Sequence, residues 1–270
     1  MFSGLAPHWH YGVLVVAAFA AGVINAMAGG GSFLSFPAML ALGVPPIEAN
    51  ATNTVALWPG QLTSLFTLHD DVRRDLLPVV LITSLIGGIA GAEVLLHTPQ
   101  RTFVHLIPWL LLGGAVIFGV SGHISRWLGR RTAGHAPMAS TQVPGESFDR
   151  PIPAVPLALA LLPICFYVGY FGAGGGFLIM TVLALFGLED MHKLNALKVV
   201  TAATANFCAI VTFIFSGRIV WHYCLVAMVA AAVGGYIGAR NARAMNPSVL
   251  RAVVVITGVV IAGYFFWREY

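Results

Sequence analysis

Charged residues are scarce in this chain of 270 residues. Lys and Arg number 14 and Asp and Glu 10, so 9% of the chain is charged, against about 25% in a typical soluble domain. The scarcity argues against a soluble enzyme and against a nucleic-acid-binding protein, which needs basic side chains to contact phosphates. Intrinsic disorder is excluded as well, because 58% of the residues are hydrophobic and disordered chains combine low hydrophobicity with high charge.

Cysteine is almost as rare, and signatures of catalysis and of cofactor binding are lacking. Cys165, Cys208 and Cys224 lie in apolar runs without CxxC spacing, so we interpret them as small buried residues rather than metal ligands or disulfide partners. No GK[ST] follows the glycine runs, which excludes a Walker loop, and neither Ser32 nor Ser35 has a His base in its apolar run. The sequence predicts no cofactor, no metal site and no enzyme activity.

Long apolar runs are what the chain has in abundance. Its mean hydropathy is +0.86, and each run is long enough for a membrane-spanning helix or part of one. The first run follows a segment without basic residues, Met1–Tyr11, so it is expected to stay in the protein rather than act as a cleaved signal peptide. We predict an all-α, multi-pass helical protein of the lipid bilayer. The apolar runs cover residues 12–28, 32–43, 47–68, 76–96, 103–122, 153–173, 177–187, 194–216, 220–239 and 248–267.

The chain divides into two similar halves around a polar stretch. Residues 123–152 are rich in Arg, Pro, Gly and Ser, a composition typical of a solvated linker. The segment Ala28–Leu34 (AGGGSFL) returns 145 residues later as Ala173–Ile179 (AGGGFLI). Two more landmarks recur in the same order: Asn50-Ala51 as Asn195-Ala196, and GGIAGA at 87–92 as GGYIGA at 234–239. We predict a first transmembrane repeat over 1–122, a linker over 123–152 and a second repeat over 153–270.

The glycine runs also bear on the direction of the repeats. As one helix, residues 12–42 would be about 46 Å long at 1.5 Å per residue, well beyond the ~30 Å hydrocarbon core. Three consecutive glycines should break such a helix, so a wholly or partly re-entrant hairpin is expected. Such a hairpin begins and ends on the same side of the membrane. With three more helices, each half then crosses the membrane an odd number of times, and the second half is inverted relative to the first.

Basic residues favour the inverted arrangement, with the linker in the cytoplasm and both termini outside, because cytoplasmic loops carry an excess of Lys and Arg. With hairpins, ten basic residues share the side of the linker and three lie opposite; with four spans per half the split is eight to five. The ten are Arg73, Arg74, Arg126, Arg130, Arg131, Arg150, Lys193, Arg240, Arg243 and Arg251, and the three are Arg101, Arg218 and Arg268.

Each glycine run predicts an anion site. Irregular backbone at membrane depth survives only where protein or a water-filled cavity covers it. The helix expected to resume at Ser32, or at Phe177, would present free N–H groups and the positive end of its dipole, which together bind anions. Close helix packing through small residues is the structural alternative, but the break recurs at corresponding positions, as it does in transporters with discontinuous helices.

Polar residues in the following apolar runs are candidate ligands for the same anion. Lys198 lies inside such a run, at the repeat position of Asn53, where a buried cation would pair with a substrate; snorkelling to the nearby interface is the alternative. Gln61 and Asn206 occupy one repeat position and could bind substrate or join helices. The candidate binding residues are Gly29, Gly30, Gly31, Ser32, Asn50, Thr52, Asn53, Gly174, Gly175, Gly176, Asn195, Lys198, Thr201 and Asn206.

Other polar and small residues are assigned structural roles. Glu48, which follows Pro45-Pro46, is interpreted as complementing a helix dipole rather than carrying a coupling proton. The spacing of Gly87 with Gly91, and of Gly234 with Gly238, predicts close helix contacts.

These residues together resemble a known family. The segment Asn25–Ser32 (NAMAGGGS), Gly43–Pro46 (GVPP) and Ala49–Asn53 (ANATN) are similar to the sulfite exporter TauE/SafE family of bacterial permeases, and so, in the second half, are Gly172–Gly176, Lys198, Asn206, Phe215–Ile219 and Gly234–Gly238. The resemblance covers nearly the whole chain except the termini and the linker. It implies a protein of the bacterial inner membrane that moves sulfur-containing anions such as sulfite or organosulfonates, usually outward. The linker is longer than expected, and Phe177 stands where the first repeat has Ser32.

The resulting hypothesis is a secondary transporter for a small anionic substrate, working by alternating access as in other inverted-repeat transporters. An anion channel and a permease for a non-sulfur carboxylate are the alternatives. The sequence leaves open the anion, the direction of transport, whether H+ or Na+ is the coupling ion, and whether the protein forms a homodimer.

Overall fold

The computed structural model describes residues 7–27, 29–134, 152–188, 190–240 and 247–269, and within these ranges the chain is all-helical. Five helices are long and apolar enough to cross a membrane, as expected of a multi-pass membrane protein. The helices are α1 (Pro7–Met27), α2 (Ser32–Ala41), α3 (Pro46–Thr67), the 3-10 helix η1 (His69–Asp71), α4 (Leu77–His97), α5 (Gln100–Gly134), α6 (Ala154–Tyr170), α7 (Gly175–Leu185), α8 (Met191–Ser216), α9 (Trp221–Arg240) and α10 (Pro247–Glu269).

Several helix boundaries differ from the sequence prediction by a few residues, and those of α5 and α7 bear on the linker and on the site. Helix α5 continues to Gly134, so the first part of the expected linker, 123–134, is helical, and residues 135–151 lie outside the described part of the chain. No proline interrupts α5 beyond Pro108, and a polar sequence can stay helical once it has left the apolar layer. Helix α7 begins at Gly175 rather than at Phe177, because Gly174 takes a φ of 78° and forms the N-cap.

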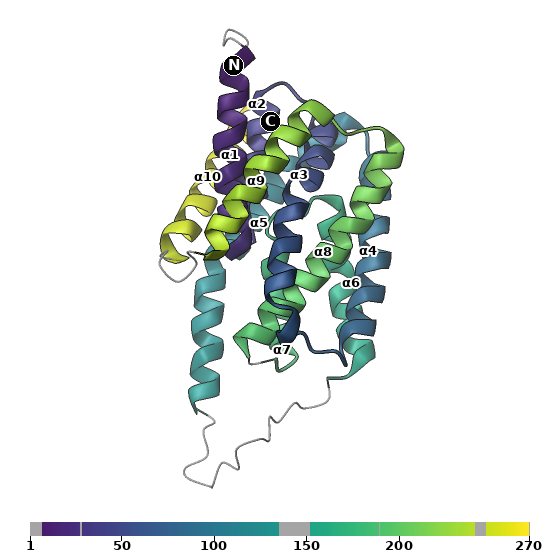
Figure 1. The fold of residues 1–270 in the computed structure, drawn as a ribbon, viewed down its shortest axis with the longest axis vertical. Helices are drawn as coiled ribbons and strands as arrows, with labels where there is room; N and C mark the ends of the chain where they lie inside the picture. Colours follow the sequence, from purple (N-terminus) through teal and green to yellow (C-terminus); the bar gives the residue numbers. More distant parts are fainter. Residues whose placement is uncertain (1–6, 28, 135–151, 189, 241–246, 270) are drawn as a thin grey trace.

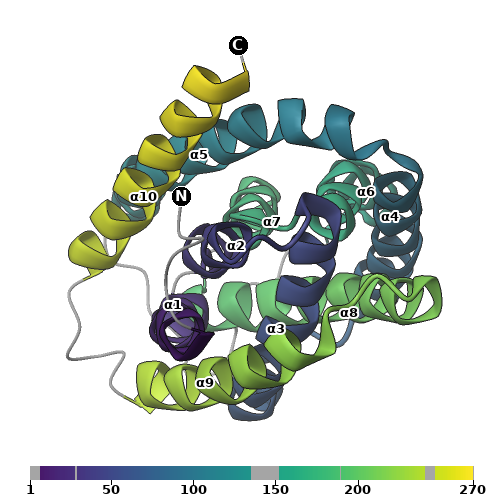
Figure 2. The same ribbon diagram turned by 90° about the horizontal axis from the view of Figure 1, so that it is seen from above.

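The short helices α2 and α7 fold back along the helices that precede them. In Figure 1, α1 descends from the end of the bundle where α10 finishes, and α2 climbs back toward that end. We call this the terminal end, and the opposite end, where α5 finishes and α6 begins, the linker end. Helix α6 climbs from the linker end and α7 returns toward it. Figure 2 shows α2 and α7 inside a ring formed by longer helices.

The two halves of the chain are interleaved rather than packed side by side. Helix α1 packs along α9, α4 along α6 and α8, α3 along α9 and α8, and α5 along α10. Glycines allow several of these contacts, as predicted: a Cβ on Gly91 would lie 2.1 Å from the carbonyl oxygen of Phe166, and one on Gly234 would lie 2.1 Å from that of Phe19. This interleaving brings residues from both halves to the middle of the bundle.

Candidate functional site

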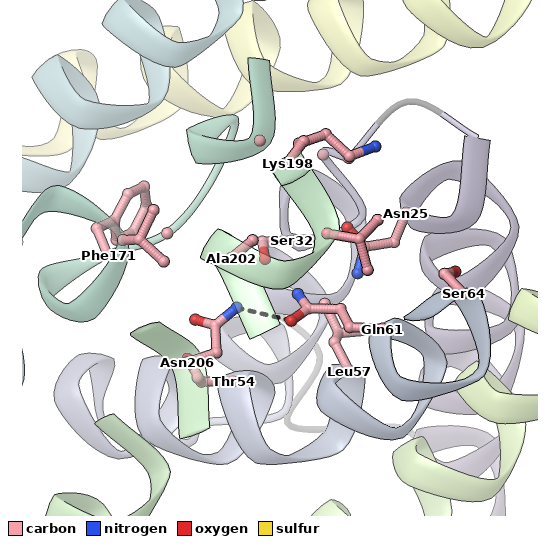
Figure 3. Close-up of a pocket in the computed structure, with 16 residues that line it drawn as sticks. Asn25, Ser32, Thr54, Leu57, Gln61, Ser64, Phe171, Lys198, Ala202 and Asn206 are labelled. Atoms are coloured by element: carbon pink, nitrogen blue, oxygen red, sulfur yellow. Dashed lines mark hydrogen bonds between the residues drawn. The ribbon is translucent and has the colours of Figure 1, made fainter. Parts of the chain in front are cut away.

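A small cavity of about 50 Å³ lies in the middle of the bundle, between the two helix breaks. Both halves of the chain line it, through the α1–α2 connection and α3 on one side and through the α6–α7 connection and α8 on the other (Figure 3). Its lining residues are Asn25, Gly29, Gly30, Ser32, Thr54, Leu57, Gln61, Ser64, Val168, Phe171, Gly172, Gly176, Lys198, Val199, Ala202 and Asn206.

The two glycine runs meet at this cavity. A Cβ on Gly29 would lie 3.7 Å from the Cα of Gly176, so the two hairpin tips touch backbone to backbone. Neither α2 nor α7 has a side-chain hydrogen bond capping its start, and the first N–H groups of a helix have no partner within the helix. The cavity is thus bordered by the positive ends of two helix dipoles.

Lys198 is the charged residue among the described residues that line the cavity. The side chain leaves α8 about two turns after the helix start at Met191, at 3.6 residues per turn, and is only 5% exposed. Its stem passes Gly176, where an added Cβ would lie 3.5 Å from Cδ, and in Figure 3 the amine lies on the same side of the cavity as Asn25. No residue of the described chain gives the amine a hydrogen bond or an ion pair. Because its side chain is buried, Lys198 does not extend to the membrane interface.

Amides and hydroxyls complete the polar lining. Asn206 donates from Nδ2 to Oε1 of Gln61 at 3.0 Å, a bond drawn in Figure 3, so these two residues both join the halves and face the cavity. Ser32 lies half-buried at the start of α2, and Ser64 is buried, with its hydroxyl donating to the Gly60 carbonyl at 3.1 Å. These groups offer neutral donors and acceptors around one cation.

Several predicted ligands do not line the cavity, because they hold neighbouring helices together. Asn50 donates to the carbonyl of Tyr170 at 3.0 Å, and Thr52 accepts from the backbone N–H of Val220 at 3.0 Å. Asn53 accepts a short hydrogen bond from the hydroxyl of Ser35. These three side chains of α3 are buried. They form hydrogen bonds with groups of neighbouring helices and connections inside the bundle and do not reach the cavity.

The remaining predicted ligands have local roles. The hydroxyl of Thr201 donates to Leu197 one turn back in α8, at 2.6 Å. Asn195, half-buried near the start of α8, is absent from the cavity lining, and so is Gly174. Close packing accounts for two glycines, because a Cβ on Gly31 would meet the Ala21 carbonyl oxygen at 2.2 Å and one on Gly175 would meet Val168 at 2.5 Å. Within one glycine run, some residues permit packing and others line the cavity.

Three polar residues of the cavity, Asn25, Thr54 and Ser64, were missed by sequence reasoning as ligands. Asn25 lies in the last turn of α1, two residues from its end, and Ser64 lies in the last turn of α3. A polar residue next to the glycine run was the available signal for Asn25. Ser64 carries no comparable signal, because serine is common near helix ends.

Contacts between the two halves of the chain lie at the terminal end of the bundle. Glu48 on α3 pairs with Arg218 in the α8–α9 connection, with 2.6 Å between Oε1 and NH1, and also accepts from the amide of Gln100. Below this pair, the rings of Phe36 and Phe171 meet edge to face, with centroids 5.4 Å apart. Glu48 is the acid in the first turn of α3, as its predicted dipole role requires, and it also joins the two halves.

Comparison with known proteins agrees with this architecture. A family model described as "Sulfite exporter TauE/SafE" matches residues 14–265, nearly the whole chain. The chain belongs to the TauE/SafE family. Three curated relatives of this TauE/SafE protein have similar lengths, and all are named as probable membrane transporter proteins. No solved structure gives a significant match.

The relatives are distant but cover the chain almost completely. A protein of Sinorhizobium is 28% identical over 92% of this chain and 89% of its own length. The Escherichia coli K12 protein YfcA is 25% identical, with 96% and 90% covered. A protein of Haemophilus influenzae is 26% identical, with 95% and 94% covered. The family match and these transporter relatives support a membrane permease.

Proposed function

We propose that this protein is a secondary transporter that exports a small sulfur-containing oxyanion, such as sulfite, across the bacterial inner membrane. The observation that carries the proposal is the unpaired Lys198 in a cavity bordered by the starts of α2 and α7. An unpaired cation at this depth is costly, and an anion bound beside it would remove the cost. The sulfur chemistry and the direction come from the family description.

The size of the cavity favours a small substrate. By the same measure of volume, one water needs about 10–15 Å³, so about 50 Å³ accommodates a solute of a few heavy atoms. Sulfite has four heavy atoms and fits this space, whereas a longer sulfonate would require the cavity to widen. We therefore expect compact oxyanions to bind more tightly than extended ones.

An inverted internal repeat would give this transporter its two states. Trp58 donates to the carbonyl of Ala203, and Asn206 donates to Gln61; in both bonds the partners are 145 residues apart, the offset of the sequence repeat. Equivalent positions that touch each other are expected at a two-fold axis. The opposite course of α1 and α6 in Figure 1 supports a two-fold axis in the plane of the membrane, with a Gly-broken hairpin entering from each side.

Alternating access follows from that symmetry. The cavity extends along α3 from Thr54 to Ser64, toward the linker end, while Glu48, Arg218 and the aromatic rings close the terminal end. Exchange of the conformations of the two halves would open the terminal end and close the linker end. Closure at one end favours a carrier over a continuously open anion channel.

Anion binding to purified protein tests the proposal. Sulfite and sulfate should raise the unfolding temperature in detergent, acetate should raise it less, and taurine, which carries an ammonium group, should have no effect. Lys198→Ala should abolish the anion-dependent rise, because no other charge remains in the cavity. Lys193→Ala, on the same helix but outside the cavity, is the matched control and should keep the wild-type rise. An equal response of Lys198→Ala and wild type would contradict the proposal.

A further inference from the structure

The charges around the cavity bear on which ion is coupled to transport. Among the described residues that line it, Lys198 is the one ionisable group; Asp, Glu, His, Arg and Tyr are all absent. Carboxylate oxygens are common ligands of hard cations, and no carboxylate is among the described residues that line the cavity. A site whose single charge is positive repels Na+ and attracts an anion.

A bound anion would stabilise the ammonium of Lys198. In the empty cavity it has no partner among the described residues and is almost fully buried, a situation that costs several kcal/mol for a charged group in a protein interior. A neutral amine in the same place has no such cost. Loss of the anion therefore favours loss of the proton, and binding of an anion favours its return.

Other titratable groups on the neighbouring helices lie away from Lys198 or are already engaged. On α8 itself His192 and Lys193 stand at the helix start, and on α3 Glu48 stands at the terminal end, paired with Arg218. On α4 Glu93 and His97 lie near the helix end, and η1 carries His69, Asp70 and Asp71 at the linker end. On α6 the hydroxyl of Tyr167 donates to the carbonyl of Ala173 at 2.6 Å. The sequences of α2 and α7 contain no titratable residue, and those of α1 lie in its first turns.

Resting on the proposed function, we propose that Lys198 is also the proton carrier, so that one proton crosses the membrane with each anion and Na+ takes no part. On the side where the anion leaves, the ammonium gives one proton to water and becomes a neutral amine. The empty transporter changes conformation in this neutral form. On the other side the amine takes one proton from water, and the next anion binds to the ammonium.

This coupling determines the net charge that crosses the membrane in each transport cycle. A monoanion crosses with one proton and carries no net charge, whereas a dianion crosses with one proton and carries one negative charge. The membrane potential, negative inside, then drives the dianion outward and has no effect on the monoanion. The stoichiometry and the electrical response are separate consequences of one titrating amine.

Flux measurements in proteoliposomes test the proposal. Labelled methanesulfonate and sulfate are used, because neither changes its charge between about pH 6 and about pH 8, and internal pH is followed with a trapped dye. We expect one proton per anion for both, with sulfate flux dependent on an imposed potential and methanesulfonate flux independent of it. Replacing Na+ with K+ should change nothing. Anion flux without a change of internal pH, or with a requirement for Na+, would overturn the proton-carrier role.

Variants separate this role from anion binding. Lys198→Arg keeps a permanent cation, so it should keep anion-dependent stabilisation while losing coupled proton and anion flux. Lys193→Gln should keep the wild-type ratio of protons to anions. Coupled proton and anion flux through Lys198→Arg at the wild-type ratio would also contradict the role. Absence of any anion flux in the wild type would instead remove the proposed function, and the wild-type ratio tests the coupling even if a variant fails to fold.

Discussion

Asn53 and Lys198 occupy equivalent positions in the two halves of the sequence, yet they have different surroundings. Asn53 accepts a hydrogen bond from Ser35 inside the first half, whereas Met180 stands at the repeat position of Ser35 and offers Lys198 no such partner. The lysine extends along Gly176 toward the cavity instead. The differences at these two pairs of positions, each 145 residues apart, accompany a cation at the cavity from α8 and none from α3.

Glycine contacts give a prediction about stability at the same scale. A Cβ on Gly22 would lie 2.1 Å from the carbonyl oxygen of Ala231, so Gly22→Ala must separate α1 from α9 and should cost about 1–3 kcal/mol. Gly12→Ala, on the same helix but with open space around it, should be neutral or stabilising by up to about 1 kcal/mol. Unfolding temperatures in detergent compare the two; equal values would contradict the packing described here.

Gly176 gives a second prediction, about binding. A Cβ there would make an ordinary contact of 3.5 Å with Lys198 Cδ, so Gly176→Ala should fold normally. The added methyl group takes up part of a cavity of about 50 Å³, and we expect anion affinity to fall about tenfold, a loss of ~1.4 kcal/mol. Titration of sulfate against the unfolding temperature measures the change. Unchanged affinity would mean that the anion does not contact the α7 start.

At the scale of helices, α3 holds the terminal end closed through polar contacts with the second half. Glu48 pairs with Arg218, and one turn later Thr52 accepts from the N–H of Val220. The pair is partly accessible, with 17% of the Glu48 side chain and 43% of the Arg218 side chain exposed, so its contribution is limited to about 1 kcal/mol. A contact of this strength can hold one conformation in preference to another and still break in each transport cycle.

Breaking the pair should shift the transporter toward the state open at the terminal end. In a variant without native cysteines, Ser32→Cys places a thiol at the cavity, and an impermeant maleimide applied from the terminal side reports access. Glu48→Gln should increase the labelling rate up to about fivefold, as about 1 kcal/mol implies. The exchange Glu48→Arg with Arg218→Glu should restore the slow rate. Equal rates in all three proteins would show that the pair does not control access.

The positions of the helices could be predicted from sequence far better than the directions in which their side chains point. Apolar runs bounded by Gly, Pro and charge gave ten segments close to the ten α-helices of the described chain, and the largest difference is the extension of α5 to Gly134. Lys198 and the glycines were identifiable because charge and broken backbone are costly in an apolar run. Asn50, Thr52 and Asn53 were not separable from true lining residues, because the contacts that engage them come from residues such as Tyr170 and Val220, far away in sequence.

At the scale of the whole molecule, the interleaved halves make the sidedness of the protein testable. Helices α4 and α8 both end at the terminal end in Figure 1, where His97 and Phe215 are exposed. Asp70 and Gly187, at the linker end, are exposed as well. Cysteines at the first two positions should react with an impermeant maleimide in intact cells, and those at the other two only after permeabilisation. Any other grouping of the four would contradict the inverted arrangement.

The account as a whole depends on an anion binding between the two hairpin tips. An experimental structure of the protein with selenate, whose selenium is located by anomalous scattering, tests this most directly. We predict one selenium position in the cavity, with an oxygen about 3 Å from Nζ of Lys198 and others facing the N–H groups that begin α2 and α7. Selenium absent from the cavity at saturating selenate, with the Lys198 amine paired to a protein carboxylate instead, would contradict it.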